Sequence, residues 1–266
     1  MGKRWGNELV VGHGIDPDLI EDMHRVSLDF FLSPADLKDR YEVPPDDPTI
    51  RGFYKTASYV AASDDVATAP DLCQLYTTNR LGDAGVASVE VLGDEFAVWS
   101  RPNVWPTEIP GFEPTWRRYY AALEALATEI MRLFALGLDL DERFFDDKVD
   151  DHITNLVANY YPPVDDEPLD GQYRKGPHSD WGTLTVLFQD DTGGLEVLDR
   201  DTDEWLSVPV VPGSFVVNIG DLMAVWTNDR WQSTKHRVQV PPVTRRSPRA
   251  PICWRRFAPP MGDGPS

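Results

Sequence analysis

The stretch that decides the fold is Gly176-Pro-His178-Ser-Asp180-Trp-Gly-Thr-Leu-Thr-Val-Leu-Phe188. Its second half is apolar and β-branched, which predicts that His178 and Asp180 enter or flank a strand. Residues i and i+2 of an extended chain point to one face, so the imidazole and the carboxylate project side by side. They supply two ligands for a divalent metal ion, and a third ligand must come from elsewhere in the chain.

His236 is the candidate for the third ligand, because it opens another β-prone run, 236–240. Two histidines and one carboxylate on one side of a metal ion, with the other positions open, form the arrangement expected of non-haem Fe(II) oxygenases. The spacing His-x-Asp is a weak signal alone, since such a pair is usually solvated or joined by an ordinary hydrogen bond.

The segments around this pair are more specific. They occur in one order along the chain: His178 to Val197, 205–210, Pro212-Gly-Ser-Phe-Val-Val-Asn-Ile-Gly-Asp221, Trp226-Thr-Asn228 and 233–238. Together they closely resemble the iron- and 2-oxoglutarate-dependent dioxygenase superfamily. The nearest subgroup is the isopenicillin N synthase-like enzymes with the plant flavonoid, gibberellin and aminocyclopropane-carboxylate oxidases. The resemblance implies that His178, Asp180 and His236 are the iron ligands.

The resemblance extends toward the N-terminus. Val11-Gly-His-Gly-Ile15 is similar to the family's "NHGI" element, and Asn103-Val-Trp-Pro106 with Pro110-Gly-Phe112 is similar to its "N-x-W-P … P-G-F" segment. Asn159-Tyr-Tyr-Pro162 resembles the "N-Y-Y-P" strand, which implies that Asn159 and Tyr161 help to hold the 2-oxoacid. The family's further strand and helix before "NHGI" are missing from this sequence, so either the fold tolerates a trimmed edge or this chain is an incomplete family member.

The resemblance also implies an Arg-x-Ser pair, Arg245 and Ser247, that grips the far carboxylate of 2-oxoglutarate. An arginine suits this role because its planar fork makes two charge-assisted bonds to a carboxylate. After Ser247 the sequence departs from the family pattern, and two prolines fall inside the expected strand. A rival alignment anchored on Phe257 and Pro259 leaves no arginine at this position. We favour Arg245, because a buried dianion without a cation is costly. The fallbacks are Arg246 and Arg249.

Composition favours one domain, 1–266, in which 1–151 is mostly helical and 152–258 is the β core. The chain has 266 residues, 41% of them hydrophobic, enough for one sizeable core.

The net charge of −19 argues against nucleic acid or an anionic membrane as partner, and it would repel 2-oxoglutarate unless the pocket holds a local cation. Two cysteines are too few for a disulfide framework, and no apolar run is long enough to span a bilayer. We therefore expect a reduced, cytoplasmic protein.

Hydrophobic periodicity predicts a helix from Pro17, capped by Asp16, to about Phe31, a short helix after Ser33-Pro34, and a long amphipathic helix over 116–136. Helices followed by a double-sheet β unit are typical of jelly rolls and cupins, and the resemblance implies a double-stranded β-helix core. The expected strands are 153–161, 184–188, 195–198, 205–210, 214–219, 236–240 and 252–257.

The region 41–71 lacks a clear period, and we interpret it as a long surface loop. The resemblance implies that a strand over 72–80 passes the mouth of the pocket. Tyr76, Asn79 and Arg80 could then face substrate, and a solvated edge is the alternative. Trp181 and Gln189 are further candidates for the pocket wall. Four more residues are expected to be structural: His13, His24, Asp221, which would hold a turn, and Arg237, which would pair with an acid outside the site.

The leading hypothesis is an Fe(II)- and 2-oxoglutarate-dependent oxygenase that uses O2 and releases succinate and CO2. Asp180 stands where halogenating relatives have a small residue, which favours hydroxylation or desaturation over halogenation. One alternative is an isopenicillin N synthase or aminocyclopropane-carboxylate oxidase-type enzyme that does not consume 2-oxoglutarate. Others are a metal-binding but catalytically weak family member and a purely structural β protein. The substrate is expected to be a small molecule, either a secondary metabolite or an amino-acid derivative, and the sequence does not determine it or the oligomeric state.

Overall fold

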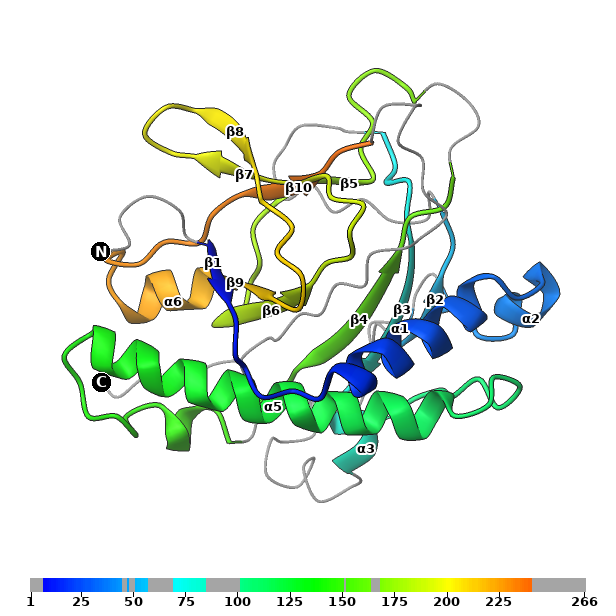
Figure 1. The fold of residues 1–266 in the computed structure, drawn as a ribbon, viewed down its shortest axis with the longest axis horizontal. Coiled ribbons are helices and arrows are strands. Elements are labelled where there is room, and N and C mark those ends of the chain that lie inside the picture. Colours follow the sequence, from blue (N-terminus) through cyan, green and yellow to red (C-terminus); the bar gives the residue numbers. More distant parts are fainter. Residues whose placement is uncertain are drawn as a thin grey trace.

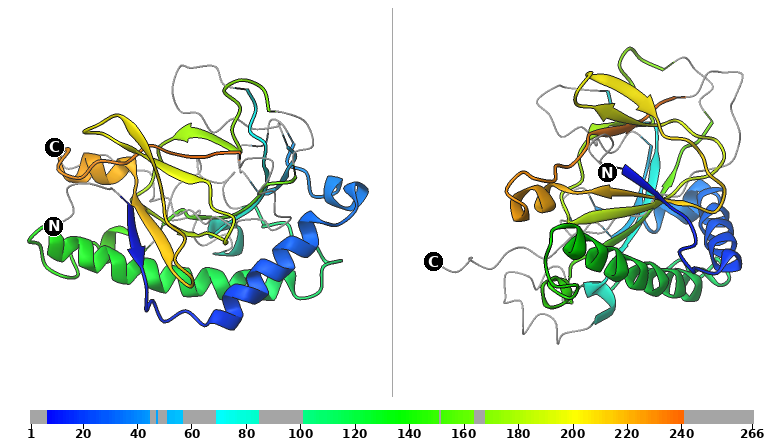
Figure 2. Two further views of the ribbon diagram at one scale, coloured as in Figure 1. Left: turned by 45° about the horizontal axis from the view of Figure 1, so that its top comes forward. Right: turned by 60° about the vertical axis from the view of Figure 1, so that its left-hand side comes forward.

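The computed structural model describes residues 7–44, 47, 51–56, 69–84, 101–150, 152–163 and 168–240. In Figures 1 and 2, the two longest helices lie on one side of the β strands, so a helical layer covers a mainly β structure. This arrangement confirms the expected class, a β core preceded by helices. No helix in these ranges is long and apolar enough to cross a membrane.

The first long helix, α1 (Pro17–Phe31), begins where the sequence predicts. Asp16 is the N-cap, and its carboxylate accepts a hydrogen bond of 3.0 Å from the backbone N–H of Asp18. The short helix α2 (Ala35–Asp39) follows. Apolar residues at helical spacing, among them Met23, Val26 and Phe30, are almost fully buried, as the period requires.

The second long helix, α5 (Phe112–Gly137), begins four residues earlier than the period predicts. Gly111 is its N-cap and has a left-handed backbone with φ of 79°, which a glycine adopts without steric cost. The helix ends at Gly137, one residue later than predicted. The acidic segment that follows contains only a 3₁₀ turn, η2 (Asp146–Lys148).

A three-stranded antiparallel sheet lies against these helices, in the order β2 (Gly52–Tyr54), β3 (Gln74–Asn79) and β4 (Asn155–Tyr160). The short helix α3 (Leu81–Ala84) follows β3. Strand β2 corrects the prediction of an uninterrupted loop over 41–71. Its three residues are too few to show a period in the sequence, and pairing with β3 holds them extended.

The sheet turns alternate residues toward the helices. Along β4, Leu156, Ala158 and Tyr160 belong to the main hydrophobic core, whereas Val157 and Tyr161 belong to a separate cluster on the other face. Asn159 shares the face of Val157 by the same alternation. The helices therefore fix the sheet from one side and leave the Asn159 side for the site.

Two further antiparallel sheets form the rest of the β core. One has the order β1 (Asn7–Val10), β9 (Phe215–Ile219) and β6 (Leu184–Phe188). The other has the order β5 (Lys175–His178), β10 (His236–Val238), β7 (Leu195–Asp199) and β8 (Glu204–Ser207). Six of the seven expected runs overlap β4, β6, β7, β8, β9 or β10, and the seventh, 252–257, lies outside the described residues. The sequence did not indicate the short helix α6 (Asp221–Trp226).

The turn between β9 and α6 packs directly on the loop that carries Asp180. The backbone N–H of Asp221 donates to the Asp180 carbonyl at 2.7 Å, and the N–H of Gly220 donates to the Thr183 carbonyl at 3.0 Å. A Cβ atom on Gly220 would lie 2.0 Å from the carbonyl oxygen of Gly182, much closer than two such atoms can approach. Only glycine fits at this position.

We predict that Gly220→Ala both destabilises the fold and disturbs the Asp180 loop. Overpacking against backbone should cost about 1–3 kcal/mol of unfolding free energy, measured by urea denaturation, and divalent-metal affinity should fall as well. Gly171→Ala is the control, because a Cβ there meets nothing within 4 Å and only the left-handed φ of 69° is strained. Unchanged metal affinity in Gly220→Ala would contradict the coupling between this turn and Asp180.

Candidate metal centre

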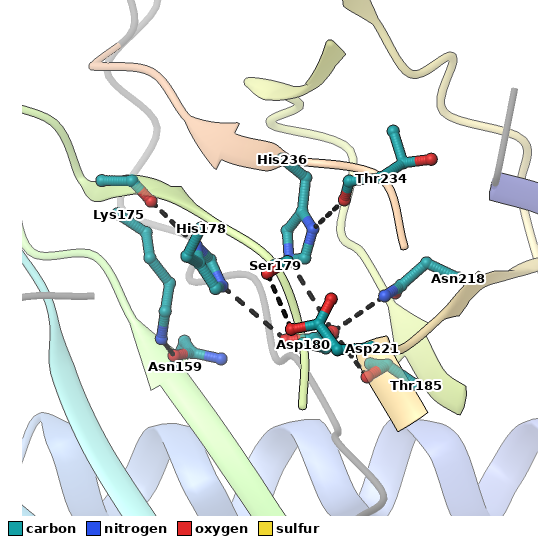
Figure 3. Close-up of polar contacts among 11 residues, drawn as sticks. Asn159, Lys175, His178, Ser179, Asp180, Thr185, Asn218, Asp221, Thr234 and His236 are labelled. Atoms are coloured by element: carbon teal, nitrogen blue, oxygen red, sulfur yellow. Dashed lines mark hydrogen bonds and ion pairs between the residues drawn. The ribbon is translucent and has the colours of Figure 1, made fainter. Parts of the chain in front are cut away.

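The structure brings His178, Asp180 and His236 together in the β core (Figure 3). His178 ends β5, Asp180 follows in the next loop, and His236 opens β10, where it is the cross-strand partner of His178. One potential ligand atom from each residue lies within 4.8 Å of the other two, and all three residues are buried. A single ion can therefore reach all three side chains.

Backbone carbonyls orient both imidazole rings. Nδ1 of His178 lies 2.8 Å from the Gly176 oxygen, and Nδ1 of His236 lies 3.2 Å from the Thr234 oxygen. A carbonyl only accepts, so each Nδ1 carries the proton and each Nε2 presents a lone pair. The two Nε2 atoms each lie 3.8 Å from a different carboxylate oxygen of Asp180. Outer hydrogen bonds of this kind are typical of histidines that bind metals.

Asp180 is held from the opposite sheet. The Thr185 hydroxyl on β6 donates to its Oδ2 at 2.6 Å, and the Asn218 amide on β9 donates to the same oxygen at 2.8 Å. Both donors are buried, so the bonds form in a low-dielectric interior where they are strong. The carboxylate orientation is thus fixed before any metal binds.

The donor set fits a hard or borderline divalent ion such as Fe(II). It consists of two neutral imidazole nitrogens and one carboxylate, all preoriented, on one side of the point where they converge. A pocket enclosing about 530 Å³ of space, part of it open to solvent, adjoins them. Its wall is formed by Tyr161, Lys175, His178, Thr185, Leu187, Gln189, Asp190, Gly193, Leu195, Asn218, His236 and Val238.

Two charged residues besides the histidines and Asp180 belong to this region. Asp190 lies in the pocket wall, and burial raises the pKa of its carboxyl above the usual value, although hydrogen bonds from Thr192 act in the opposite direction. Lys175 lies in the wall with only 4% of its surface exposed. We did not single out Lys175 from the sequence, although the basic pair Arg174-Lys175 entering the ligand strand is an unusual signal.

The predicted co-substrate residues fall into two groups. Tyr161 lines the pocket, and Asn159 is fully buried on β4, where its side-chain oxygen accepts a bond of 3.0 Å from Lys175 Nζ. Arg245 and Ser247 lie outside the described residues, as do both fallback arginines. Their role stays a prediction.

The structure places the suggested substrate residues elsewhere. Tyr76 faces the helices, where its ring lies 4.8 Å from that of Phe30. Asn79 is buried in a hydrogen-bond cluster with Asn155 and Asn103. Arg80 lies 3.4 Å from Glu124 of α5. None of the three is among the residues of the pocket wall, and their contact with a substrate stays a prediction.

The structure also locates four other residues that the sequence singled out. Arg237 pairs with Glu196 at 2.7 Å and stacks on the Trp205 ring at 4.0 Å, outside the metal site. Asp221 is structural, since its carboxylate accepts from the Ser179 hydroxyl at 3.0 Å. Gln189 lines the pocket, whereas Trp181 is 66% exposed and is not part of the pocket wall.

A two-histidine, one-carboxylate site between antiparallel sheets defines the class of non-haem iron oxygenases. Two family profiles agree with this class. That of the 2OG-Fe(II) oxygenase superfamily matches residues 153–253, and that of the non-haem dioxygenase in morphine synthesis N-terminal region matches residues 2–108. The first match contains all three candidate ligands.

Curated relatives lead to the same family. Validamycin A dioxygenase of Streptomyces hygroscopicus subsp. limoneus is 34% identical over 244 residues, which cover 89% of this chain and 63% of that protein. The 2-oxoglutarate-Fe(II) type oxidoreductase ppzD of Metarhizium majus is 34% identical over 245 residues, covering 87% and 69%. This chain thus spans about two thirds of the length of these relatives.

Solved structures share the fold. A putative 2OG-Fe(II) oxygenase family protein from Caulobacter crescentus superposes with a TM-score of 0.79 at 29% identity, covering 96% of this chain and 78% of that one. A full-length Neurospora crassa protein, solved in complex with alpha-KG and thymine, superposes with a TM-score of 0.77 at 30% identity, covering 95% and 76%. The chain belongs to the 2OG-Fe(II) oxygenase superfamily, and its core is the double-stranded β-helix of that family.

We predict that Thr185→Val lowers metal affinity while preserving the fold. The substitution keeps the shape but removes the hydroxyl that orients Asp180, and losing such an outer contact typically weakens metal binding about 10- to 100-fold. The measurement is an anaerobic Fe(II) titration followed by calorimetry.

Thr183→Val is the matched control for this prediction. Thr183 is equally buried, and its hydroxyl has no hydrogen-bond partner among the residues described, so its loss should leave metal affinity unchanged. Equal affinity of the Thr185 variant and the unmodified protein would show that the carboxylate does not need this donor.

Proposed function

We propose that this chain is an Fe(II)- and 2-oxoglutarate-dependent oxygenase that hydroxylates or desaturates a small organic molecule. The observation that carries the proposal is the preoriented trio of His178, Asp180 and His236 facing a pocket. Both imidazole lone pairs and a fixed carboxylate converge on one point, and maintaining this arrangement in a buried interior is otherwise costly. Metal binding would explain why the chain maintains this arrangement.

His178 Nε2, His236 Nε2 and the Asp180 carboxylate would hold the iron. When bound there, iron would supply the chemistry of the superfamily, in which O2 and 2-oxoglutarate are consumed and succinate and CO2 are released as substrate is oxidised. The protein orients the ligands through Gly176, Thr234, Thr185 and Asn218, and it keeps the site out of bulk water.

The pocket wall suits a 2-oxoacid with a short aliphatic chain. Leu187, Leu195 and Val238 provide apolar walls, and Tyr161 also lines the pocket. In the proposal, Asn159 and Tyr161 contact the co-substrate, and Arg245 with Ser247 binds its far carboxylate. The arginine fork would offset the repulsion from a chain of net charge −19.

A small-molecule substrate agrees with what the similar proteins are named for. Validamycin A dioxygenase and the thymine complex of the Neurospora crassa protein both concern small organic molecules. We extend only this size class to the present chain. The net charge argues against nucleic acid and anionic membrane as partners, and a cytoplasmic location stays a prediction from cysteine usage.

The test begins without oxygen. Fe(II) and then 2-oxoglutarate are added to metal-free protein, and the visible charge-transfer band of the chelate is recorded. Admission of O2 should then yield succinate. We predict that His178→Ala abolishes the band and the succinate, because two ligands hold iron much more weakly than three.

His13→Ala is the control, since this histidine lies 2.9 Å from the Gly213 carbonyl oxygen and is not among the residues of the pocket wall, and it should behave as the unmodified protein. Iron binding without the band would rule out 2-oxoglutarate and favour an oxidase that does not consume it. Absence of iron binding in the unmodified protein would refute the proposal as a whole.

A further inference from the structure

Arg237 lies on the outer face of β10, directly beside the candidate ligand His236. His236 and Val238 both line the pocket, so the alternation of a strand puts Arg237 on the opposite face of the sheet. Figure 3 shows the His236 ring reaching from β10 toward Asp180. Arg237 and His236 are neighbouring side chains of one strand, so a constraint on the position of Arg237 also constrains the direction of the ligand.

The Arg237 side chain links β10 to its neighbours in the sheet. β10 lies between β5 and β7, and β8 pairs with β7 (Figure 1). Nε of Arg237 donates to Oε2 of Glu196 on β7 at 2.7 Å, and the two residues are direct cross-strand partners. The guanidinium carbon lies 4.0 Å from the centroid of the Trp205 ring on β8 and 5.3 Å from that of Tyr173, two residues before β5. We call Arg237, Glu196, Trp205 and Tyr173 the Arg237 cluster.

Partial burial strengthens this cluster. The side chains of Arg237 and Glu196 are only 15% and 18% exposed, so water screens their attraction less than that of an exposed ion pair. A guanidinium can donate to a carboxylate while its flat face rests on an aromatic ring. Gln239, just after β10, donates to the same Glu196 oxygen at 3.2 Å. The cluster therefore restricts β10 more than an isolated surface pair would.

The backbone pairing of β10 alone constrains it weakly. β10 has only three residues, and its pairing with β5 is irregular between His236 and Val238. A slip of one residue would turn His236 to the outer face and Arg237 into the pocket, because the side-chain period of a strand is two. Such a slip would also separate Arg237 from Glu196 and from both rings. The cluster thus opposes the displacement that would remove the third ligand.

We propose that the Arg237 cluster fixes the register of β10 and thereby positions His236 for the metal ion. This inference rests on the proposed function, because it concerns the affinity and geometry of the same metal site. Arg237 is a positioning residue, which acts through His236 from the face of the sheet that lies away from the pocket. An ionic and aromatic cluster outside the site then becomes a determinant of metal binding.

The charge and the position of Arg237 have opposite effects on the metal site. Arg237 carries a positive charge one residue away from a ligand for a divalent cation. Loss of that charge alone should strengthen metal binding, because two cations repel each other. Loss of the register constraint should weaken metal binding instead. The sign of the change in metal affinity therefore separates the two effects.

The test uses two variants of Arg237 and a matched control. Arg237→Met removes the charge and the planar fork, whereas Arg237→Lys keeps a charge that can pair with Glu196 but lacks the flat group that rests on the rings. Arg117→Met is the control, because Arg117 also pairs with a glutamate, Glu113 at 2.9 Å, and also lies over a tryptophan, Trp105 at 5.0 Å. Arg117 lies on α5 and is not among the residues of the pocket wall.

Three properties are measured on the full chain. Metal-free protein is titrated anaerobically with Fe(II) by calorimetry, which gives the dissociation constant. Titration with Co(II) gives visible absorption bands, whose positions report the geometry of the bound ligands. Urea denaturation of the metal-free proteins measures the stability of the fold separately from metal binding.

We expect Arg237→Met to bind Fe(II) about 10-fold more weakly, at the lower end of the range for a lost outer contact of a ligating histidine. Its Co(II) bands should shift, because His236 no longer meets the metal at the same angle. Arg237→Lys should show a smaller loss of affinity. Arg117→Met should keep the affinity and the bands of the unmodified protein, even if its fold is less stable to urea.

Unchanged or tighter Fe(II) binding by Arg237→Met would overturn the inference, and the proposed function would stand if the unmodified protein still forms its chelate band with 2-oxoglutarate. Equal weakening in Arg117→Met would indicate general destabilisation and would also overturn it. If Arg237→Met does not fold, Arg237→Lys decides, and affinity and bands equal to those of the unmodified protein would contradict positioning. Absence of metal binding by the unmodified protein would refute the inference and the proposed function together.

Discussion

The site depends on the hydrogen bonds that hold Asp180 between two sheets. Asp180 follows β5 of one sheet, and its Oδ2 accepts from Thr185 on β6 and Asn218 on β9 of the other. Its backbone carbonyl accepts from the N–H of Asp221. A carboxylate with 1% exposure is costly to bury, and these bonds offset part of that cost. The same contacts fix the distance between the sheets at the point where the two histidines approach.

The helical layer supports the site indirectly, by packing against the sheet that contains β4. Rings of α1, β3 and α5 pack edge to face, with Tyr76 5.1 Å from Phe112 and 5.3 Å from Trp116. This core anchors the helix-facing side of β4, and β4 presents Asn159 and Tyr161 on its other side. The rigid packing of a strand against two helices thus positions side chains that reach the pocket. A cluster far from the metal ligands helps to determine the pocket geometry.

Much of this architecture follows from local patterns in the sequence. The period of 3.6 residues locates α1 and α5, and the alternation in short apolar runs locates most strands. The metal ligands are predictable because the i, i+2 rule brings His178 and Asp180 to one face and the family resemblance supplies His236. Thr185 and Asn218 carry a weaker signal, as polar residues inside apolar strands, and such residues usually satisfy a buried partner.

Other features depend on long-range pairing that a local pattern does not contain. The face on which Tyr76 lies is set by its register with Ala158 of β4, and that partner is 82 positions away in sequence (158 − 76). Lys175 turns toward the pocket because β5 has one more residue than β10 between paired positions. The strand β5 itself contains Gly176 and Pro177, which obscure it in the sequence. Cross-strand geometry, rather than residue type, decides these outcomes.

The most direct measurement of the central claim is anomalous diffraction at the iron edge from crystals grown with Fe(II) without oxygen. The account predicts one strong iron peak within bonding distance of Nε2 of His178, Nε2 of His236 and the carboxylate of Asp180. An iron peak beside other residues, or no peak where these three side chains converge, would contradict the account.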